Sequence, residues 1–305
     1  MNETVTLKSG IKIPAIGFGP GSLGYSPIMK RHCGWIKAHI NYYLGRFYFN
    51  RKQEKRYIHS IANALRVGFR LLDYSITYGN LPLIKEAIDK SGVRREEIFI
   101  TTRIGNSEQF KNNIRDRFFY NLESWGLSKI DLLQFHWPVT DKFLHTWEEM
   151  IRLREEGYVR VLGVANCHKH HLEELEKETG ILPEINQFEV HPLFSQKDLI
   201  QYCKDKGITV EAYTPIARFD DRLVRLPLLK ELEKKYNKDF IQVILRWHIQ
   251  NGIIPVVRTL NPKHQASNID IFDFTLSKED MQKIDAININ SRLRYDPDNC
   301  DFSIL

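Results

Sequence analysis

The stretch IFITTR, residues 98–103, is an apolar run rich in residues that favour β-strands, and it ends in a charged arginine. Seven other short apolar runs follow one another along the chain, and most of them also end at a polar residue. The eight runs are AIGFG (15–19), FRLLD (69–73), IFITTR (98–103), LLQFHW (132–137), VRVLGVAN (159–166), INQFEV (185–190), TVEAYT (209–214) and IIPVVR (253–258). Continuous apolar runs of this length predict strands that are buried on both faces, as in a parallel sheet.

The segments between these runs have the spacing of amphipathic helices, and several of them end at glycine, as helix C-termini do. They are IHSIANALRVG (58–68), LIKEAIDKSG (83–92), HTWEEMIRLREEG (145–157), HHLEELEKETG (170–180) and KDLIQYCKDKG (197–207). Eight strands alternating with helices predict a (β/α)8 TIM barrel, preceded by a β-hairpin formed by TVTL and IKIP. No linker or low-complexity stretch divides the chain, so we expect residues 1–305 to form a single barrel domain.

Composition excludes several classes of protein. The four cysteines are widely spaced, which favours a reduced, cytoplasmic protein over a disulfide framework or a zinc site. The N-terminus lacks the pattern of a signal peptide, and no apolar run is long enough to predict a membrane span. The net charge of +6 comes from residues 20–57, where eight basic residues accompany a single acid, Glu54. Because the charge belongs to one segment, we do not expect nucleic-acid binding by the fold as a whole.

Polar residues fall at the carboxyl ends of the predicted strands, which form the active-site face of a TIM barrel. They are Asp73, Arg103, His136, Asn166, Gln187, Tyr213 and Arg258. Tyr78 follows Asp73 by five residues, and neighbouring strands would bring it close to Arg103 and His136. A tyrosine is a poor acid at neutral pH unless a nearby cation favours its phenolate. Arg103, held by Asp73, can supply that cation, which predicts general-acid catalysis on a carbonyl oxygen.

The sequence resembles the aldo-keto reductases over nearly its whole length. The resemblance rests on GFRLLDYSITYGN, IFITTRIG, LLQFHWP, EEGYVRVLGVANC, EINQFEVHP, EAYTPIAR and IIPVVRTLNPKHQASN, in this order. It implies an NAD(P)H-dependent oxidoreductase that reduces an aldehyde or ketone, with Tyr78, Asp73 and His136 matching three of the family's four catalytic positions. It also implies that Tyr213 stacks on the nicotinamide and that Asn166 and Gln187 bind its carboxamide.

One catalytic position and the cofactor segment depart from the family's pattern. Arg103 stands where the family typically has lysine, and its wide planar fork replaces a compact point charge. In the cofactor segment, Arg258 and Thr259 replace a Lys-Ser pair, His264 replaces an arginine, and a serine precedes Asn268. These residues still suit the 2′-phosphate and adenine of NADPH, so we expect NADPH, with NADH as the alternative.

Residues 20–57 are predicted to form a basic, aromatic insertion within the first strand-to-helix loop of the barrel. About 25 of these residues have no counterpart in typical relatives of the family that the chain resembles. The insertion is either an extra helix with solvated cations or a flap suited to a large or anionic carbonyl substrate. Binding of a partner protein or of an anionic membrane surface is a further alternative.

Two motifs are interpreted as structural. GPGSLG (19–24) matches a dinucleotide-binding glycine pattern, but no acid follows at the required distance, so we expect no Rossmann unit. HKHH (168–171) is not accompanied by a cluster of acids or cysteines in the right geometry, so we expect a helix start or a solvated surface and no metal site. The oligomeric state is open, with a monomer favoured.

Two alternatives to a reductase remain. The chain could be a cofactor-binding, non-catalytic or regulatory barrel that uses the insertion as a binding surface. It could also be a barrel enzyme of another reaction type, such as a lyase or isomerase.

Overall fold

Eight parallel strands close into a barrel, and their order around it, β10-β3-β4-β5-β6-β7-β8-β9, follows the chain. The computed structural model describes residues 3–21, 50–75 and 81–304. The strands are β1 (Thr4–Thr6), β2 (Lys12–Pro14), β3 (Gly17–Phe18), β4 (Leu71–Asp73), β5 (Phe99–Ile104), β6 (Ile130–Phe135), β7 (Val159–Ala165), β8 (Ile185–Glu189), β9 (Thr209–Tyr213) and β10 (Ile253–Val257). All eight predicted barrel strands are confirmed, and the antiparallel pair β1–β2 confirms the predicted hairpin.

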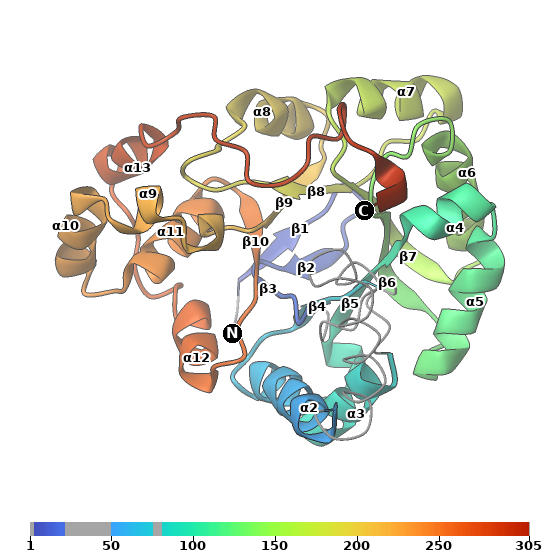
Figure 1. The fold of residues 1–305 in the computed structure, drawn as a ribbon, viewed down its shortest axis with the longest axis horizontal. Coiled ribbons are helices and arrows are strands. Elements are labelled where there is room, and N and C mark those ends of the chain that lie inside the picture. Colours follow the sequence, from blue (N-terminus) through green and yellow to red (C-terminus); the bar gives the residue numbers. More distant parts are fainter. Residues whose placement is uncertain (1–2, 22–49, 76–80, 305) are drawn as a thin grey trace, which may run out of the picture.

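Helices surround the barrel (Figure 1). They are α2 (Asn50–Arg66), α3 (Leu81–Ser91), α4 (Asn106–Lys111), α5 (Ile114–Trp125), α6 (Phe143–Glu155), α7 (Lys169–Thr179), α8 (Lys197–Asp205), α9 (Asp221–Val224), α10 (Pro227–Tyr236), α11 (Phe240–Gln250), α12 (Pro262–Ile269) and α13 (Lys278–Asp285). Within the described ranges, the short 3-10 helices are η3 (Arg95–Glu97), η4 (Ala217–Phe219) and η5 (Phe302–Ile304). In the described ranges, no helix combines the length and apolarity needed to cross a bilayer.

The glycine ends of the predicted helices are confirmed where backbone geometry requires glycine. Gly92 follows α3 with a φ of 76°, and Gly180 follows α7 with a φ of 68°. This left-handed conformation is open to glycine at little cost, so each helix stops where the sequence pattern indicated. Because β3 pairs with β4 and β10 in a closed barrel, the GPGSLG stretch does not begin a doubly wound sheet.

The interior of the barrel is apolar at one end and polar at the other. The hairpin closes the amino-terminal end, where its side chains pack against inward-facing residues of the strands. This apolar cluster consists of Leu7, Ile13, Leu71, Phe99, Leu132, Val161, Ile185 and Ile254. Alternation along β4 and β5 then places Asp73 and Arg103 inward, nearer the carboxyl end. The fold thus seals one end and leaves the polar residues at the face where barrel active sites lie.

Residues after α13 run across this carboxyl-terminal face, coloured red in Figure 1, from α13 past α8 and α7 to α4. Asn106 of α4 donates a hydrogen bond to the carbonyl oxygen of Phe302, at 3.1 Å. Phe302 also packs against Trp137, which follows β6. The end of the chain therefore borders the candidate site.

Candidate active site

A buried ion pair joins the ends of β4 and β5. Arg103 Nη1 lies 2.7 Å from Asp73 Oδ1, with 3% and 10% of the two side chains exposed. Ladder pairing sets Asp73 opposite Thr101, so Asp73 and Arg103 point into the same interior on adjacent strands. The structure thus confirms the predicted pairing of the two residues and gives the buried guanidinium the anion that it needs.

Gln187 of β8 completes the contacts of the arginine fork. Its Oε1 accepts a hydrogen bond from Arg103 Nη2 at 2.7 Å, and its Nε2 donates to Asp73 Oδ2 at 3.3 Å. Gln187 Nε2 also donates to Glu211 Oε2 at 2.9 Å. The contact with Gln187 uses the second terminal nitrogen of the guanidinium, which a lysine at position 103 would lack. The predicted role of Gln187 toward a carboxamide stays a prediction.

Glu211 and Gln134 belong to the same buried network, and the sequence reasoning missed both. Gln134 Nε2 donates to Glu211 Oε2 at 3.3 Å, and both residues are almost fully buried. Burial, together with the charge of Asp73, raises the pKa of the Glu211 carboxyl to about 7. Both residues lie inside predicted strands, and the inward positions of those strands were the signal that could have revealed them.

We expect Glu211→Gln to raise the free energy of unfolding at pH 8 and to change this free energy little at pH 4. The carboxyl has an ordinary pKa of 4.5 and a folded-state pKa of about 7. Between these values the folded chain keeps a proton that the unfolded chain releases, so the wild type loses stability as pH rises through this window. The gain at pH 8 should be about 3 kcal/mol in the free energy of unfolding by urea.

The matched control is Glu174→Gln, the same change at an exposed position of α7. It should alter the free energy of unfolding by less than about 0.5 kcal/mol, equally at both pH values. A Glu211→Gln variant whose stability shifted equally at pH 4 and pH 8 would contradict the raised pKa.

His136, Asn166 and Tyr213 form a second group at the same face. Asn166 Nδ2 donates to the carbonyl oxygen of His136 at 2.9 Å, and the Tyr213 hydroxyl donates to Asn166 Oδ1 at 2.7 Å. Burial, together with the charges of Arg103 and Arg294, lowers the pKa of His136 to about 3. Burial raises the pKa of Tyr213 well above its usual range. Neither side chain is therefore a ready proton donor at neutral pH.

Four cofactor-binding residues were predicted after β10. Arg258 and His264 are exposed, Thr259 is half-buried, and Asn268 is buried with 5% of its surface accessible. Asn268 Oδ1 has no hydrogen-bond partner among the described residues. An unsatisfied buried acceptor is costly, and a ligand N–H would satisfy it. Asn268 could therefore accept a hydrogen bond from a ligand, and the assignment of these four residues to the adenine and 2′-phosphate end of NADPH stays a prediction.

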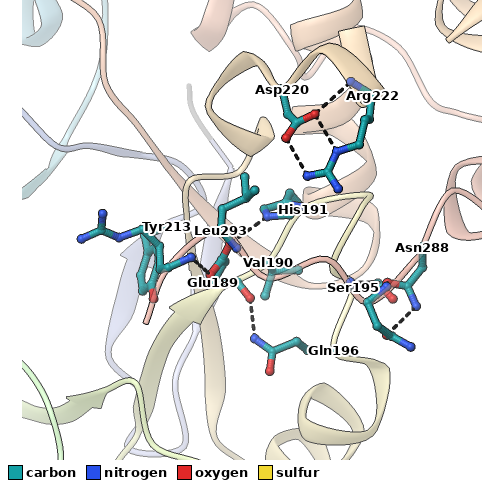
Figure 2. Close-up of polar contacts among 12 residues, drawn as sticks. Glu189, Val190, His191, Ser195, Gln196, Tyr213, Asp220, Arg222, Asn288 and Leu293 are labelled. Carbon is teal, nitrogen blue, oxygen red and sulfur yellow. Dashed lines mark hydrogen bonds and ion pairs between the residues drawn. The ribbon is translucent and has the colours of Figure 1, made fainter. Parts of the chain in front are cut away.

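Glu189, at the end of β8, holds the C-terminal segment over the barrel. Figure 2 shows its carboxylate turned toward Leu293 and His191. The backbone N–H groups of Leu293 and Arg294 donate to it at 2.7 and 2.9 Å, and His191 Nε2 contacts it at 2.9 Å. Burial opposes ionisation of Glu189, but these bonds outweigh burial and lower its pKa. Arg294 is thereby fixed beside the group formed by His136 and Tyr213.

The histidines of HKHH lie at the start of α7, as one interpretation of the sequence proposed, but an acid lies among them. Asp298 Oδ2 is 2.6 Å from His168 Nδ1, and Asp298 Oδ1 is 3.3 Å from His170 Nε2. His171 Nδ1 accepts the backbone N–H of His168, so the proton of its neutral ring is on Nε2, toward Asp298. The expectation that no acid accompanies these histidines is wrong. Asp298 was missed because it is 130 residues away from His168 in sequence. We interpret the cluster as an anchor for the C-terminal segment.

Tyr78, the predicted acid, lies outside the described residues, as does most of the predicted insertion, residues 22–49. The predicted helical character of part of that insertion is likewise outside them. The described end of the 20–57 segment enters α2, which begins at Asn50. The roles of Tyr78 and of the insertion remain predictions.

Comparisons with known proteins agree with this geometry. The sequence model of the Aldo/keto reductase family matches residues 43–289. The chain is 40% identical to glyoxal reductase of Bacillus subtilis over 243 residues, which cover 80% of this chain and 87% of that protein. It is 35% identical to methylglyoxal reductase DkgA of Escherichia coli O157:H7, covering 79% and 88% of the two chains.

Solved structures of the same family share the fold. The aldo-keto reductase MGS-M4, from a deep-sea metagenome library, superposes with a TM-score of 0.85 at 30% identity, covering 98% of this chain and all of the other. The aldo-keto reductase of Bombyx mori, solved in complex with NADP, gives a TM-score of 0.81 at 27% identity, covering 98% and 96%. The chain belongs to the aldo/keto reductase family and is an oxidoreductase of that class.

Proposed function

We propose that this protein reduces a small aldehyde or ketone to an alcohol with NADPH, and that Tyr78 is the general acid. The observation that carries the proposal is the buried Asp73–Arg103 ion pair at the carboxyl end of the barrel. It fixes a permanent cation at the end of β5, next to the strand from which Tyr78 follows. A cation at this place favours the phenolate and makes a tyrosine a better acid.

The other polar residues of the site are less suited to donate the proton. His136, with its pKa lowered to about 3, is neutral and can offer a hydrogen bond to the carbonyl oxygen. Tyr213 has a raised pKa, and its hydroxyl is already donated to Asn166. The work of proton transfer therefore falls to Tyr78, and orientation of the carbonyl falls to His136.

The cofactor supplies the hydride, and the residues of this chain hold it. Tyr213 of β9 offers its ring, Gln187 lies on the neighbouring strand β8, and Asn166, which follows β7, accepts the hydroxyl of Tyr213. Arg258, Thr259 and His264 are assigned to the 2′-phosphate and Asn268 to the adenine. The relatives named for glyoxal and methylglyoxal reduction make small dicarbonyls the first substrates to test.

A fluorescence titration with NADPH and NADH, followed by assays with glyoxal and methylglyoxal, tests this proposal. We expect NADPH to bind more tightly than NADH. The Arg258→Ala variant should bind NADPH about tenfold more weakly than the wild type, because a charge-assisted contact to the 2′-phosphate is lost. NADH lacks this phosphate, so its affinity for the variant is the matched control. The proposal would be overturned if neither cofactor bound, or if a bound cofactor were not oxidised in the presence of glyoxal or methylglyoxal.

A further inference from the structure

A pocket lies between α2 and the loop that leads into α12. Its volume is about 610 Å³, and it is lined by Lys52, Lys55, Arg56, His59, Ser60, Leu260 and Pro262. The two helices lie side by side in Figure 1, and Asn63 of α2 donates to Gln265 Oε1 of α12 at 2.7 Å. The pocket is separate from the Asp73–Arg103 site in the barrel interior.

The basic side chains of the pocket occupy one face of α2. Lys52, Lys55, Arg56 and His59 follow one another at the three- and four-residue spacing that brings side chains together on a helix. Glu54, the acid nearest in sequence, is two residues from Lys52 and therefore points to another side of the helix. Like charges at these spacings repel one another, so the arrangement is unfavourable without an anion.

Nothing in the described part of the chain neutralises these cations. No carboxylate there forms an ion pair with Lys52, Lys55 or Arg56. The sequence extends this conclusion, because residues 22–49 contain no aspartate or glutamate. That segment therefore has no acidic side chain that could pair with these cations, and an anion from another molecule can take this place.

The walls of the pocket are fixed in place. Gln265 is fully buried, and its Nε2 donates to Ser60 Oγ at 2.8 Å and to the carbonyl oxygen of Thr259 at 3.0 Å. Ser60 Oγ in turn donates to the Thr259 carbonyl oxygen at 3.2 Å. These bonds hold the basic face of α2 against the 259–262 loop. The charged side chains are therefore brought together before a ligand binds.

We infer that this pocket binds a phosphate-bearing ligand. Several closely spaced cations suit a multivalent oxyanion better than a single carboxylate, because each adds a charge-assisted contact. Leu260, which is 46% exposed, and Pro262 offer an apolar wall for the remainder of the ligand. We assign the pocket to a separate phosphorylated molecule, because its basic residues come from α2 and not from the residues to which the 2′-phosphate of NADPH is assigned.

The test is an equilibrium titration of the full chain with inorganic pyrophosphate. The pocket variant is Lys52→Gln/Lys55→Gln/Arg56→Gln, and the charge-matched control is Lys204→Gln/Lys234→Gln/Lys278→Gln, at exposed lysines of α8, α10 and α13. We expect the pocket variant to weaken pyrophosphate binding by at least about tenfold and the control by less than about twofold. Equal weakening in both variants, or no saturable binding to the wild type, would overturn the inference.

A second titration identifies the source of the phosphate. Pyrophosphate is added to protein saturated with NADPH, and its affinity is compared with that of the free protein. Unchanged affinity supports a separate phosphorylated ligand, whereas loss of binding would show that the pocket is part of the cofactor's own phosphate site and would overturn the inference. The first titration uses neither a cofactor nor a carbonyl, so it can succeed or fail independently of the reductase assays.

Discussion

Replacing Arg103 with methionine should destabilise the protein by about 3–5 kcal/mol and abolish measurable reduction. Methionine keeps an unbranched chain of similar length but removes the charge that Asp73 faces at 2.7 Å. The carboxylate would remain in a place where only 10% of its side chain is exposed, with Gln187 as its remaining described hydrogen-bond donor. Burying an unpaired charge costs far more than losing a pair in solvent. Urea unfolding at pH 7 measures this cost.

A matched control is Arg115→Met. Arg115 forms an ion pair with Glu156 at the same distance, 2.7 Å, but their side chains are 34% and 41% exposed. An exposed pair contributes at most about 1 kcal/mol, so this variant should lose little. If Arg103→Met cost no more than Arg115→Met, the buried pair would not have the importance that we assign to it. Adding Asp73→Asn to Arg103→Met should recover part of the loss, because both charges are then gone.

Arg103→Lys separates the charge of this residue from its shape. Lysine keeps a cation for Asp73 but has no second terminal nitrogen to take the place of Arg103 Nη2 beside Gln187. We expect the variant to fold and to reduce carbonyls at a rate within about tenfold of the wild type, since the electrostatic effect on Tyr78 is retained. A rise from almost no turnover to a high rate would favour the alternative of a non-catalytic barrel.

The strands of the barrel were predictable because each of them is a local pattern. A run such as VRVLGVAN is apolar on both faces, and this pattern indicates a strand between a barrel interior and a helical layer. The end of a strand is also local, which is why Asp73, Arg103 and His136 were placed correctly on one face. Strand order then followed from the tendency of consecutive βα units to be neighbours.

Contacts between distant segments were less predictable. Glu211 lies inside an apolar strand, and its raised pKa depends on burial and on Asp73, neither of which a local pattern reveals. Asp298 reaches the histidines of α7 from the far end of the chain, so spacing rules for metal ligands could not include it. The basic segment was recognised from composition, but the pocket also needed Leu260 and Pro262 from the loop after β10.

Replacing Tyr78 with phenylalanine should lower kcat for carbonyl reduction by about 10²–10⁴-fold, the range expected when a general acid is lost. The change removes one hydroxyl group and keeps the aromatic ring. NADPH affinity should stay within about twofold, because Arg258, Thr259, His264 and Asn268 are all unchanged. The measurement is a comparison of kcat and of the dissociation constant for NADPH between the variant and the wild type.

Tyr120→Phe is the control for this change. Tyr120 is 58% exposed on α5 and its ring lies under Arg117, at 5.0 Å from the guanidinium carbon. The same hydroxyl is removed far from the barrel interior, so kcat should not change. Full activity in Tyr78→Phe would show that another group donates the proton. Of the remaining candidates, His136 is neutral with a pKa of about 3 and Tyr213 has a raised pKa, so that outcome would require a donor from outside the described residues or from solvent.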